Sequence, residues 1–258
     1  MNVFITGTNA GIGFGLTKYY LDLGYNVYGI SRSSNNTLEN YSNFKFLSQD
    51  LSDFDNASKS VASFLEGIDI LDLVILNAGV LNVVKDLKDT SLDEIQQVMD
   101  INVWANKVLI DIILEKVRYV EQIVAISSAA SKAGSRGWNA YSLSKATLNT
   151  KIKMYSNEHP ETHFCSLCPG PVDTKMQDLI SEQEENDRYP DIGRLKRAKE
   201  SSQMPNIDEA AIFISDAISK AKELGTGHFW LAKELLGNGK RKNKTISVRR
   251  IVKKIIRG

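Results

Sequence analysis

Tyr141 and Lys145 are the two side chains in this sequence whose spacing best suits acid–base chemistry. They lie four residues apart in a segment with helical periodicity, so both project from the same face of a helix. A free tyrosine has a pKa near ~10 and exchanges protons poorly at neutral pH, whereas a nearby cation stabilises the phenolate. We expect Lys145 to lower the pKa of Tyr141, and a shift of about two to three units would bring it into the range where it can act as a general acid or base.

Ser128 lies 13 residues before Tyr141, at the end of an apolar strand-like segment. Ligands of open α/β sheets bind at the carboxyl ends of strands. A hydroxyl there can donate a hydrogen bond to a substrate carbonyl and polarise it. Ser127 is the competing hydroxyl, and as a strand residue we expect it to point away.

A glycine-rich turn, Thr6–Gly13, joins the first apolar segment to a helical one. Gly7 permits a tight turn, Gly11 lets the backbone approach a pyrophosphate, and Gly13 allows close packing of helix on strand. The helix N-terminus then faces the phosphate charge. The spacing is Gly-x3-Gly-x-Gly, and a turn that is glycine-rich for structural reasons alone is the alternative.

The second apolar segment ends in Ser31-Arg32. An acidic residue at this place accepts from a free ribose 2′-hydroxyl, whereas an arginine accommodates a 2′-phosphate. The sequence therefore favours NADP(H) over NAD(H). The alternative is that Arg32 only solvates a loop.

Short apolar runs alternate with longer segments of 3.6-residue period. Several runs are apolar on both faces, which is typical of a parallel sheet covered on both sides. The expected strands are Val3–Ile5, Val27–Ile30, Phe44–Leu47, Leu71–Leu76, Gln122–Ser127, Thr162–Leu167 and Gly227–Leu231. The expected helices are Ile12–Leu23, Phe54–Glu66, Leu92–Arg118, Trp138–Glu158 and Asp208–Lys222. This alternation predicts an α/β fold with a doubly wound, Rossmann-type parallel sheet.

We expect one domain over residues 1–236, because 258 residues with 42% hydrophobic content can bury a core without disulfides or metals. The polar, helix-prone stretch Asp178–Pro205 is predicted to be a helical insertion that serves as a substrate lid. No apolar run reaches the ~18 residues of a membrane-spanning helix, and the start lacks the features of a signal peptide. We expect a cytoplasmic protein.

Six motifs together resemble the classical short-chain dehydrogenase/reductase family over about residues 1–175. They are Thr6–Gly13, Asn77-Ala78-Gly79, Asn102, Ser128, Tyr141 with Lys145, and Pro169-Gly170. The resemblance implies that Tyr141 is the proton donor in reduction and that Lys145 holds the nicotinamide ribose. It implies that Ser128 orients the carbonyl and that Asn102 supports a water-linked proton relay to Lys145.

The same resemblance implies a set of residues that contact the cofactor. They are Gly7, Thr8, Asn9, Gly11, Ile12, Gly13, Ser31, Arg32, Asp50, Leu51, Asn77, Ala78, Gly79, Tyr141, Lys145, Pro169, Gly170, Val172 and Thr174. Some have simpler interpretations: Asn102 could hydrogen-bond within a long helix, Asp50 could cap the next turn, and Pro169-Gly170 could be only a turn. Trp138 suggests a flat apolar pocket wall or a subunit contact.

Cys165 and Cys168 have the spacing C-x2-C, but no second pair and no suitably spaced histidine accompanies them. We therefore expect no metal site and no disulfide scaffold. The last expected strand lacks the Asp-Gly-Gly-like ending that often helps to build the family's tetramer. A homodimer through the Leu92–Arg118 and Trp138–Glu158 helices is the expectation, and tetramerisation stays open.

The net charge of +1 hides an asymmetry. From Lys240 onward there are nine basic and no acidic residues, which leaves about −8 on the remainder. Residues 237–258 are predicted to form a basic amphipathic tail that lies on an anionic membrane surface, docks on the protein or a partner subunit, or is disordered. Nucleic acid is a less suitable partner because the tail has no aromatic residue. Deleting residues 240–258 should leave NADPH binding intact.

The resulting hypothesis is an NADP(H)-dependent oxidoreductase that interconverts a carbonyl compound and a secondary alcohol, with Tyr141 as the acid–base group. A non-catalytic NADP(H)-binding sensor or scaffold is one alternative. A nucleotide-sugar epimerase or dehydratase is another, because those enzymes also use Tyr-x3-Lys.

Overall fold

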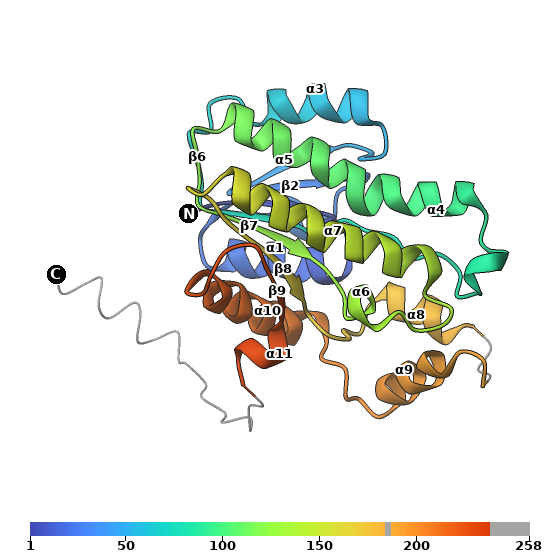
Figure 1. The fold of residues 1–258 in the computed structure, drawn as a ribbon. Coiled ribbons are helices and arrows are strands. Elements are labelled where there is room, and N and C mark those ends of the chain that lie inside the picture. The colour runs from blue at the N-terminus through green and yellow to red at the C-terminus, as the bar shows by residue number, and fades with distance from the viewer. Residues whose placement is uncertain (184–186, 238–258) are drawn as a thin grey trace.

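The computed structural model describes residues 1–183 and 187–237, so the predicted basic tail lies outside the described residues except for Gly237. A seven-stranded parallel sheet in the order β3-β2-β1-β5-β7-β8-β9 forms its centre (Figure 1). The strands are β1 (Asn2–Thr6), β2 (Asn26–Ser31), β3 (Phe44–Ser48), β5 (Leu73–Leu76), β7 (Gln122–Ile126), β8 (His163–Cys168) and β9 (His228–Leu231). The predicted doubly wound α/β fold is confirmed.

Helices cover both faces of this sheet (Figure 1). On one face lie α3 (Phe54–Phe64), α4 (Leu92–Met99), α5 (Ala105–Lys116) and α7 (Asn139–Glu158). On the other lie α1 (Gly11–Asp22) and α10 (Ile207–Lys222). Short helices complete the chain: α2 (Asn36–Glu39), the 3-10 turn η1 (Leu87–Asp89), α6 (Ala130–Ala133), α8 (Lys175–Ser181), α9 (Pro190–Glu200) and α11 (Ala232–Leu235).

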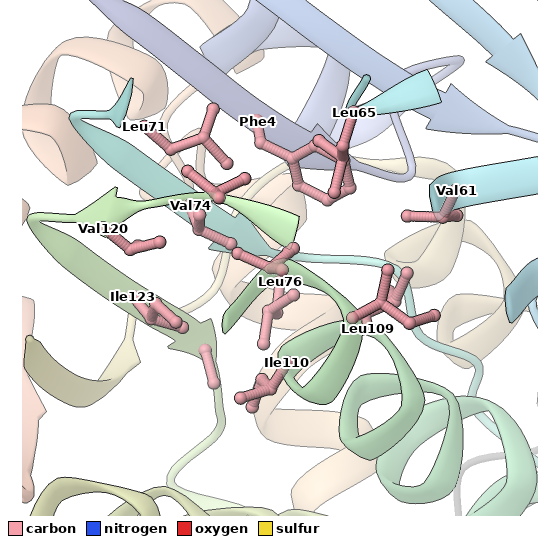
Figure 2. Close-up of a cluster of buried hydrophobic side chains, with 14 of the residues drawn as sticks. Phe4, Val61, Leu65, Leu71, Val74, Leu76, Leu109, Ile110, Val120 and Ile123 are labelled. Carbon is pink, nitrogen blue, oxygen red and sulfur yellow. The ribbon is translucent and has the colours of Figure 1, made fainter. Parts of the chain in front are cut away.

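Apolar residues on both faces of each strand explain this layered packing. In β1, Phe4 packs under α3 and α5, while its neighbours Val3 and Ile5 pack under α1 and α10. Figure 2 shows Phe4 with Val74 and Leu76 of β5 and with Leu109 of α5 in the first of these two cores. Burying these side chains on both faces places the sheet at the centre and leaves its carboxyl edge for the site.

The predicted continuous helix Leu92–Arg118 is wrong in one respect. Between α4 and α5 the chain forms a wider π-helical turn, η2 (Asp100–Trp104), in which the Ala105 N–H bonds to the carbonyl of Asp100.

The predicted strand Leu71–Leu76 is also divided, into β4 (Ile70–Leu71) and β5, and β4 pairs with β6 (Tyr119–Val120). The division falls at Asp72, whose carboxylate accepts from the backbone N–H of Asn2 at 2.6 Å.

The stretch predicted as a lid contains the end of α8 and all of α9, and both lie with α6 at one end of the molecule (Figure 1). Among the described residues no helix is long and apolar enough to cross a membrane.

Candidate active site

The direction of winding reverses between β1 and β5, which lie side by side although 66 residues separate their ends. Such a switch point is where open α/β sheets bind ligands. The glycine turn follows β1 here, with positive φ at Gly7 (75°) and Gly11 (59°). A Cβ atom on Gly13 would lie 2.2 Å from the Gly7 carbonyl oxygen, so only glycine lets α1 start this close to β1.

The first turn of α1 is free to receive an anion. Its N-cap residue, Ala10, makes no side-chain cap hydrogen bond, and the turn contains no acidic residue. The uncapped N–H groups and the helix dipole favour a phosphate. The turn therefore fits the pyrophosphate of a dinucleotide.

Asn77 and Ala78 fix the end of β5 against β1. Their backbone N–H groups both donate to the Thr6 hydroxyl at 3.0 Å, and the Asn77 side-chain amide donates to the Thr6 carbonyl at 3.0 Å. Asn77 thus has a structural role in addition to lining the cavity beside Gly79.

A depression beyond the glycine turn fits an adenosine. Of the predicted cofactor residues, Gly7, Asn9, Ser31, Arg32, Asp50, Leu51, Ala78 and Gly79 line it. Thr8 does not: its side chain is buried, and its hydroxyl lies 3.3 Å from that of Ser31. Asp50 also has the capping role considered as its alternative, because it accepts from the Ser52 N–H and hydroxyl, which lower its pKa.

A cavity of about 330 Å³ continues from there past the carboxyl ends of β5, β7 and β8. The structure brings Ser128 and Tyr141 together on its wall with Ile12 and Gly79. Pro169, Gly170, Val172 and Thr174 line it from the loop after β8. Gly11 and Gly13 are not in its lining and instead shape the turn.

Tyr141 and Ser128 line the same cavity, and Ser128 acts to lower the pKa of Tyr141. Burial raises that pKa to about 12, because desolvation of the phenolate outweighs the effect of Ser128. The direction is opposite to the expectation that Lys145 lowers this pKa. Lys145 lies on the same face of α7, but its charge does not set the direction of this shift.

Lys145 explains part of that outcome. Its ammonium group lies 5.7 Å from the centre of the Tyr141 ring and donates to the Ile126 carbonyl at 2.8 Å instead of to the phenol. Only 5% of the residue is exposed, and burial lowers its pKa to about 8. A Cβ atom on Gly79 would lie 3.5 Å from Lys145 Nζ, so glycine at this position keeps open the space in front of the ammonium.

Asn102 lies within the π turn and is fully buried. Its side-chain oxygen accepts from the Val80 N–H at 2.8 Å, and its amide donates to the Val80 carbonyl and the Ser144 hydroxyl, both at 3.0 Å. These bonds join the loop after β5 to α7, next to Lys145. The simpler interpretation, hydrogen bonding of this side chain within its own helix, is wrong, because its partners lie on the loop after β5 and on α7.

The two adjacent serines are in different surroundings. The Ser127 hydroxyl donates to the Asn149 side chain at 2.7 Å and is buried. The Ser128 oxygen accepts from the Ala130 N–H at 3.2 Å, and Ser128 lines the cavity with Tyr141. Ser128 is the hydroxyl that faces the phenol.

The outer wall of the cavity comes from helices that sequence reasoning did not resolve. Ile180 of α8 and Leu195 of α9 pack with Trp138, whose indole N–H donates to Asp191 at 3.1 Å. Trp138 is therefore a pocket wall in this chain, as one of the two predictions for it proposed. Nothing in the sequence pattern indicated Asp191 as its partner.

An ion triad joins the same region to the loop after β5. Asp86 accepts from Arg136 Nε and Nη2 at 2.7 and 2.6 Å, and from Arg188 at 2.7 Å. These guanidinium groups hold the pKa of the Asp86 carboxyl well below its usual range. The three residues span 102 positions of the chain, and no spacing rule would have found them.

Both cysteines are free, buried thiols on β8, and burial raises the pKa of each. Within residues 1–183 and 187–237 no group of three His, Cys, Asp or Glu side chains is placed to hold a metal ion.

Comparisons with known proteins agree with this geometry. The family model for short chain dehydrogenase matches residues 1–185. Benzil reductase ((S)-benzoin forming) from Bacillus subtilis is 27% identical over 90% of this chain and 98% of its own length. The enzyme of the same name from Saccharomyces cerevisiae is 30% identical over 70% of this chain and 74% of its own length.

Among solved structures, a short-chain dehydrogenase/reductase from Saccharomyces cerevisiae superposes with a TM-score of 0.79. It is 24% identical, and the match covers 90% of this chain and 95% of that one. The family model covers well over half of the sequence, and the fold agrees independently. The chain belongs to the short-chain dehydrogenase/reductase family of oxidoreductases.

Proposed function

We propose that this chain is an NADP(H)-dependent carbonyl reductase in which Tyr141 protonates the oxygen of the reduced carbonyl. The observation that carries the proposal is that Ser128 and Tyr141 line one cavity, which also reaches Ile12 at the glycine turn. When bound, the cofactor supplies the hydride.

Reduction needs Tyr141 in its protonated form. With a pKa of about 12 the phenol is protonated at neutral pH and is available as the acid that a developing alkoxide needs. Ser128 donates a second hydrogen bond to the same oxygen, which stabilises the negative charge as it develops. Lys145, buried behind the phenol, binds a ribose hydroxyl across the space that Gly79 leaves open.

We further propose that the preferred substrate is an aryl ketone or an aryl 1,2-diketone. The relatives named benzil reductase support this class, as does the cavity, where Trp138, Ile180 and Leu195 offer an apolar wall close to Tyr141. The ring centres of Trp138 and Tyr141 are 6.1 Å apart, which places a flat surface beside the acid. An aryl substituent of the carbonyl carbon can pack on that surface.

The preference for NADP(H) is part of the proposal. Arg32 lies in the adenosine depression beside Ser31, where no carboxylate of β2 competes for the ribose. A hydrogen bond to a charged group contributes ~1.5–3 kcal/mol, so Arg32→Ala should weaken NADPH about 10- to 100-fold. NADH binding should change little, and equal losses for both nucleotides would show that Arg32 does not bind the 2′-phosphate.

Turnover by a Tyr141→Phe variant tests the catalytic assignment. NADPH consumption with benzil and related aryl ketones should fall to background, while NADPH fluorescence titration gives the wild-type Kd. Substantial activity in this variant refutes the role of Tyr141. A wild-type protein that binds NADPH and consumes none with any carbonyl is a sensor or scaffold, and one that retains the nucleotide through turnover is an epimerase.

Assembly and location are also proposals. We propose a homodimer formed through α4, η2, α5 and α7, whose outer surface includes the exposed apolar residues Trp104 of η2 and Met154 of α7. For residues 240–258 we propose contact with an anionic membrane surface. Sedimentation of the full chain, and its binding to vesicles with and without anionic lipid, tests these two points.

A further inference from the structure

We propose that Lys151 is a positioning residue: its ammonium group fastens the π turn η2 to α7 and so holds Asn102 in place beside Lys145. The inference rests on the proposed function, because it assigns Lys151 a part in that reaction. No motif in the sequence singles out this lysine. It lies on α7 six residues after Lys145, and its ammonium group donates to the Val103 carbonyl.

The π turn explains why such a donor is needed. A π turn contains one residue more than an α-helical turn and interrupts the regular ladder of backbone hydrogen bonds. Two side chains donate to carbonyls of this turn: Asn106 to Asn102 at 2.8 Å, and Lys151 to Val103. The Asn106 bond stays within the helix, whereas the Lys151 bond comes from a neighbouring helix and fixes the turn in space.

Lys151 and Asn102 form two attachments between η2 and α7. The Asn102 amide reaches Ser144 at 3.0 Å, directly before Lys145 in the chain, and Lys151 holds the next residue of the turn. A Cβ atom on Gly79 would lie 3.1 Å from Asn102 Oδ1 and 3.5 Å from Lys145 Nζ, so both groups face the same small space. If the Lys151 bond is lost, Asn102 alone has to hold the turn against α7.

The surroundings of Lys151 show that its charge is not there for stability. Burial lowers its pKa to about 7, and the positive charges of Lys107 and Lys145 lower it further. Asp111 is the one opposite charge acting on it, and Asp111 already accepts from Lys107 and from the Tyr155 hydroxyl. Replacing a buried, poorly paired charge by an apolar side chain of similar length is often neutral or stabilising.

That property separates a positioning role from a packing role. Lys151→Met keeps the length of the side chain and removes its charge and its donor. Loss of the charge favours the fold and the unpaired Val103 carbonyl opposes it, so the melting temperature should change little. We expect kcat for carbonyl reduction to fall about tenfold, equivalent to ~1.4 kcal/mol of barrier, with KM and the NADPH Kd unchanged. Lys151→Arg keeps a donor and should recover most of kcat.

Lys153→Met is the matched control, because Lys153 lies on the same helix and is exposed. It should leave kcat at the wild-type value. Sedimentation of all variants checks that the oligomeric state is constant. Amide hydrogen exchange over residues 103–107 gives a readout that does not depend on activity, and exchange there should be faster in Lys151→Met than in Lys153→Met.

Wild-type kcat in Lys151→Met overturns the inference, and so does a parallel loss of kcat, NADPH binding and melting temperature. A kcat of Lys151→Arg that is as low as that of Lys151→Met also counts against the inference. A wild-type protein that reduces no carbonyl refutes the proposed function instead. In that case unchanged hydrogen exchange in Lys151→Met still shows that Lys151 does not hold the turn.

Discussion

Replacing Lys145 with methionine should remove catalysis without loss of stability at pH 7, and it should change how the free energy of unfolding depends on pH. In the folded chain burial lowers the pKa of Lys145 from 10.5 to about 8. Each unit of pKa corresponds to ~1.4 kcal/mol, so the buried ammonium destabilises the fold by about 3 kcal/mol at pH 7. Methionine removes that penalty, but it leaves the Ile126 carbonyl without its donor, which costs ~1–3 kcal/mol. We expect Lys145→Met to be between unchanged and about 2 kcal/mol more stable than wild type at pH 7.

The sign of the pH dependence follows from the lowered pKa. Between pH 8 and 10.5 the folded wild type has released the proton of Lys145, while the unfolded chain still binds it. Stability rises with pH wherever the unfolded state binds more protons. Wild type should therefore gain about 3 kcal/mol over this window relative to Lys145→Met. Contributions from groups that do not interact with Lys145 cancel, because both proteins carry them. Lys151 does not cancel fully, because the charge of Lys145 lowers its pKa.

Urea unfolding at pH 7 and at pH 10.5, without added nucleotide, measures both quantities. NADPH-dependent reduction of benzil, followed in parallel, should be lost in the variant. The reasoning is refuted if Lys145→Met is several kcal/mol less stable than wild type at pH 7 and the difference does not change with pH. That result would mean that the protein solvates this ammonium group as well as water does.

Three further outcomes follow from the same structure. Tyr141 should titrate near pH 12 in an ultraviolet difference titration of wild type against Tyr141→Phe, because burial raises its pKa, and titration below pH 10 would contradict this. Gly13→Ala should weaken NADPH binding by at least about tenfold, or ~1.4 kcal/mol, because its Cβ would lie 2.2 Å from the Gly7 carbonyl oxygen. The control is Gly67→Ala, whose Cβ would meet no atom within 4 Å; its φ of 78° strains an alanine, so it reports a backbone perturbation away from the glycine turn. Equal Kd values in the two variants would contradict the steric argument. Asp86→Asn should raise KM for aryl ketones at constant NADPH Kd, because it weakens the triad with Arg136 and Arg188 beside the cavity. These arginines lower the pKa of Asp86, so its carboxylate stays ionised, and the triad intact, at any pH above ~4. The triad is lost only at more acid pH. A wild-type KM that rises between pH 7 and pH 5 would therefore count against this role.

Much of the fold could be predicted from local patterns. Apolar runs such as Val3–Ile5 and the glycines of Thr6–Gly13 are read over a few residues, since strand burial and turn geometry restrict which side chains fit. The four-residue spacing of Tyr141 and Lys145 likewise fixes a common helix face. Element boundaries were predicted less accurately where one long-range contact determines them. An example is the boundary at Asp72, whose carboxylate accepts from the backbone N–H of Asn2, 70 positions away.

Several predicted residues do line the candidate site, whereas the direction of the Tyr141 pKa shift was not predicted. The sequence pattern predicted Ser128, Tyr141 and Gly79 as site residues, and all three line one cavity. It also predicted that Thr8 contacts the cofactor, but the side chain of Thr8 is buried. The helices α8 and α9, which close the outer wall, came only as an unspecified insertion. Their side chains meet Trp138 through packing between segments far apart in the chain, and periodicity does not encode such packing.

By itself the sequence determined the order of the strands and helices, the glycine turn and the residue types at the reacting centre, because these depend on sterics within a few residues. Only the tertiary structure decided that the pKa of Tyr141 rises, that Lys145 donates to Ile126, and that Lys151 supports a π turn. A pKa and a buried hydrogen bond depend on the neighbours that the whole fold assembles and on the water that it excludes.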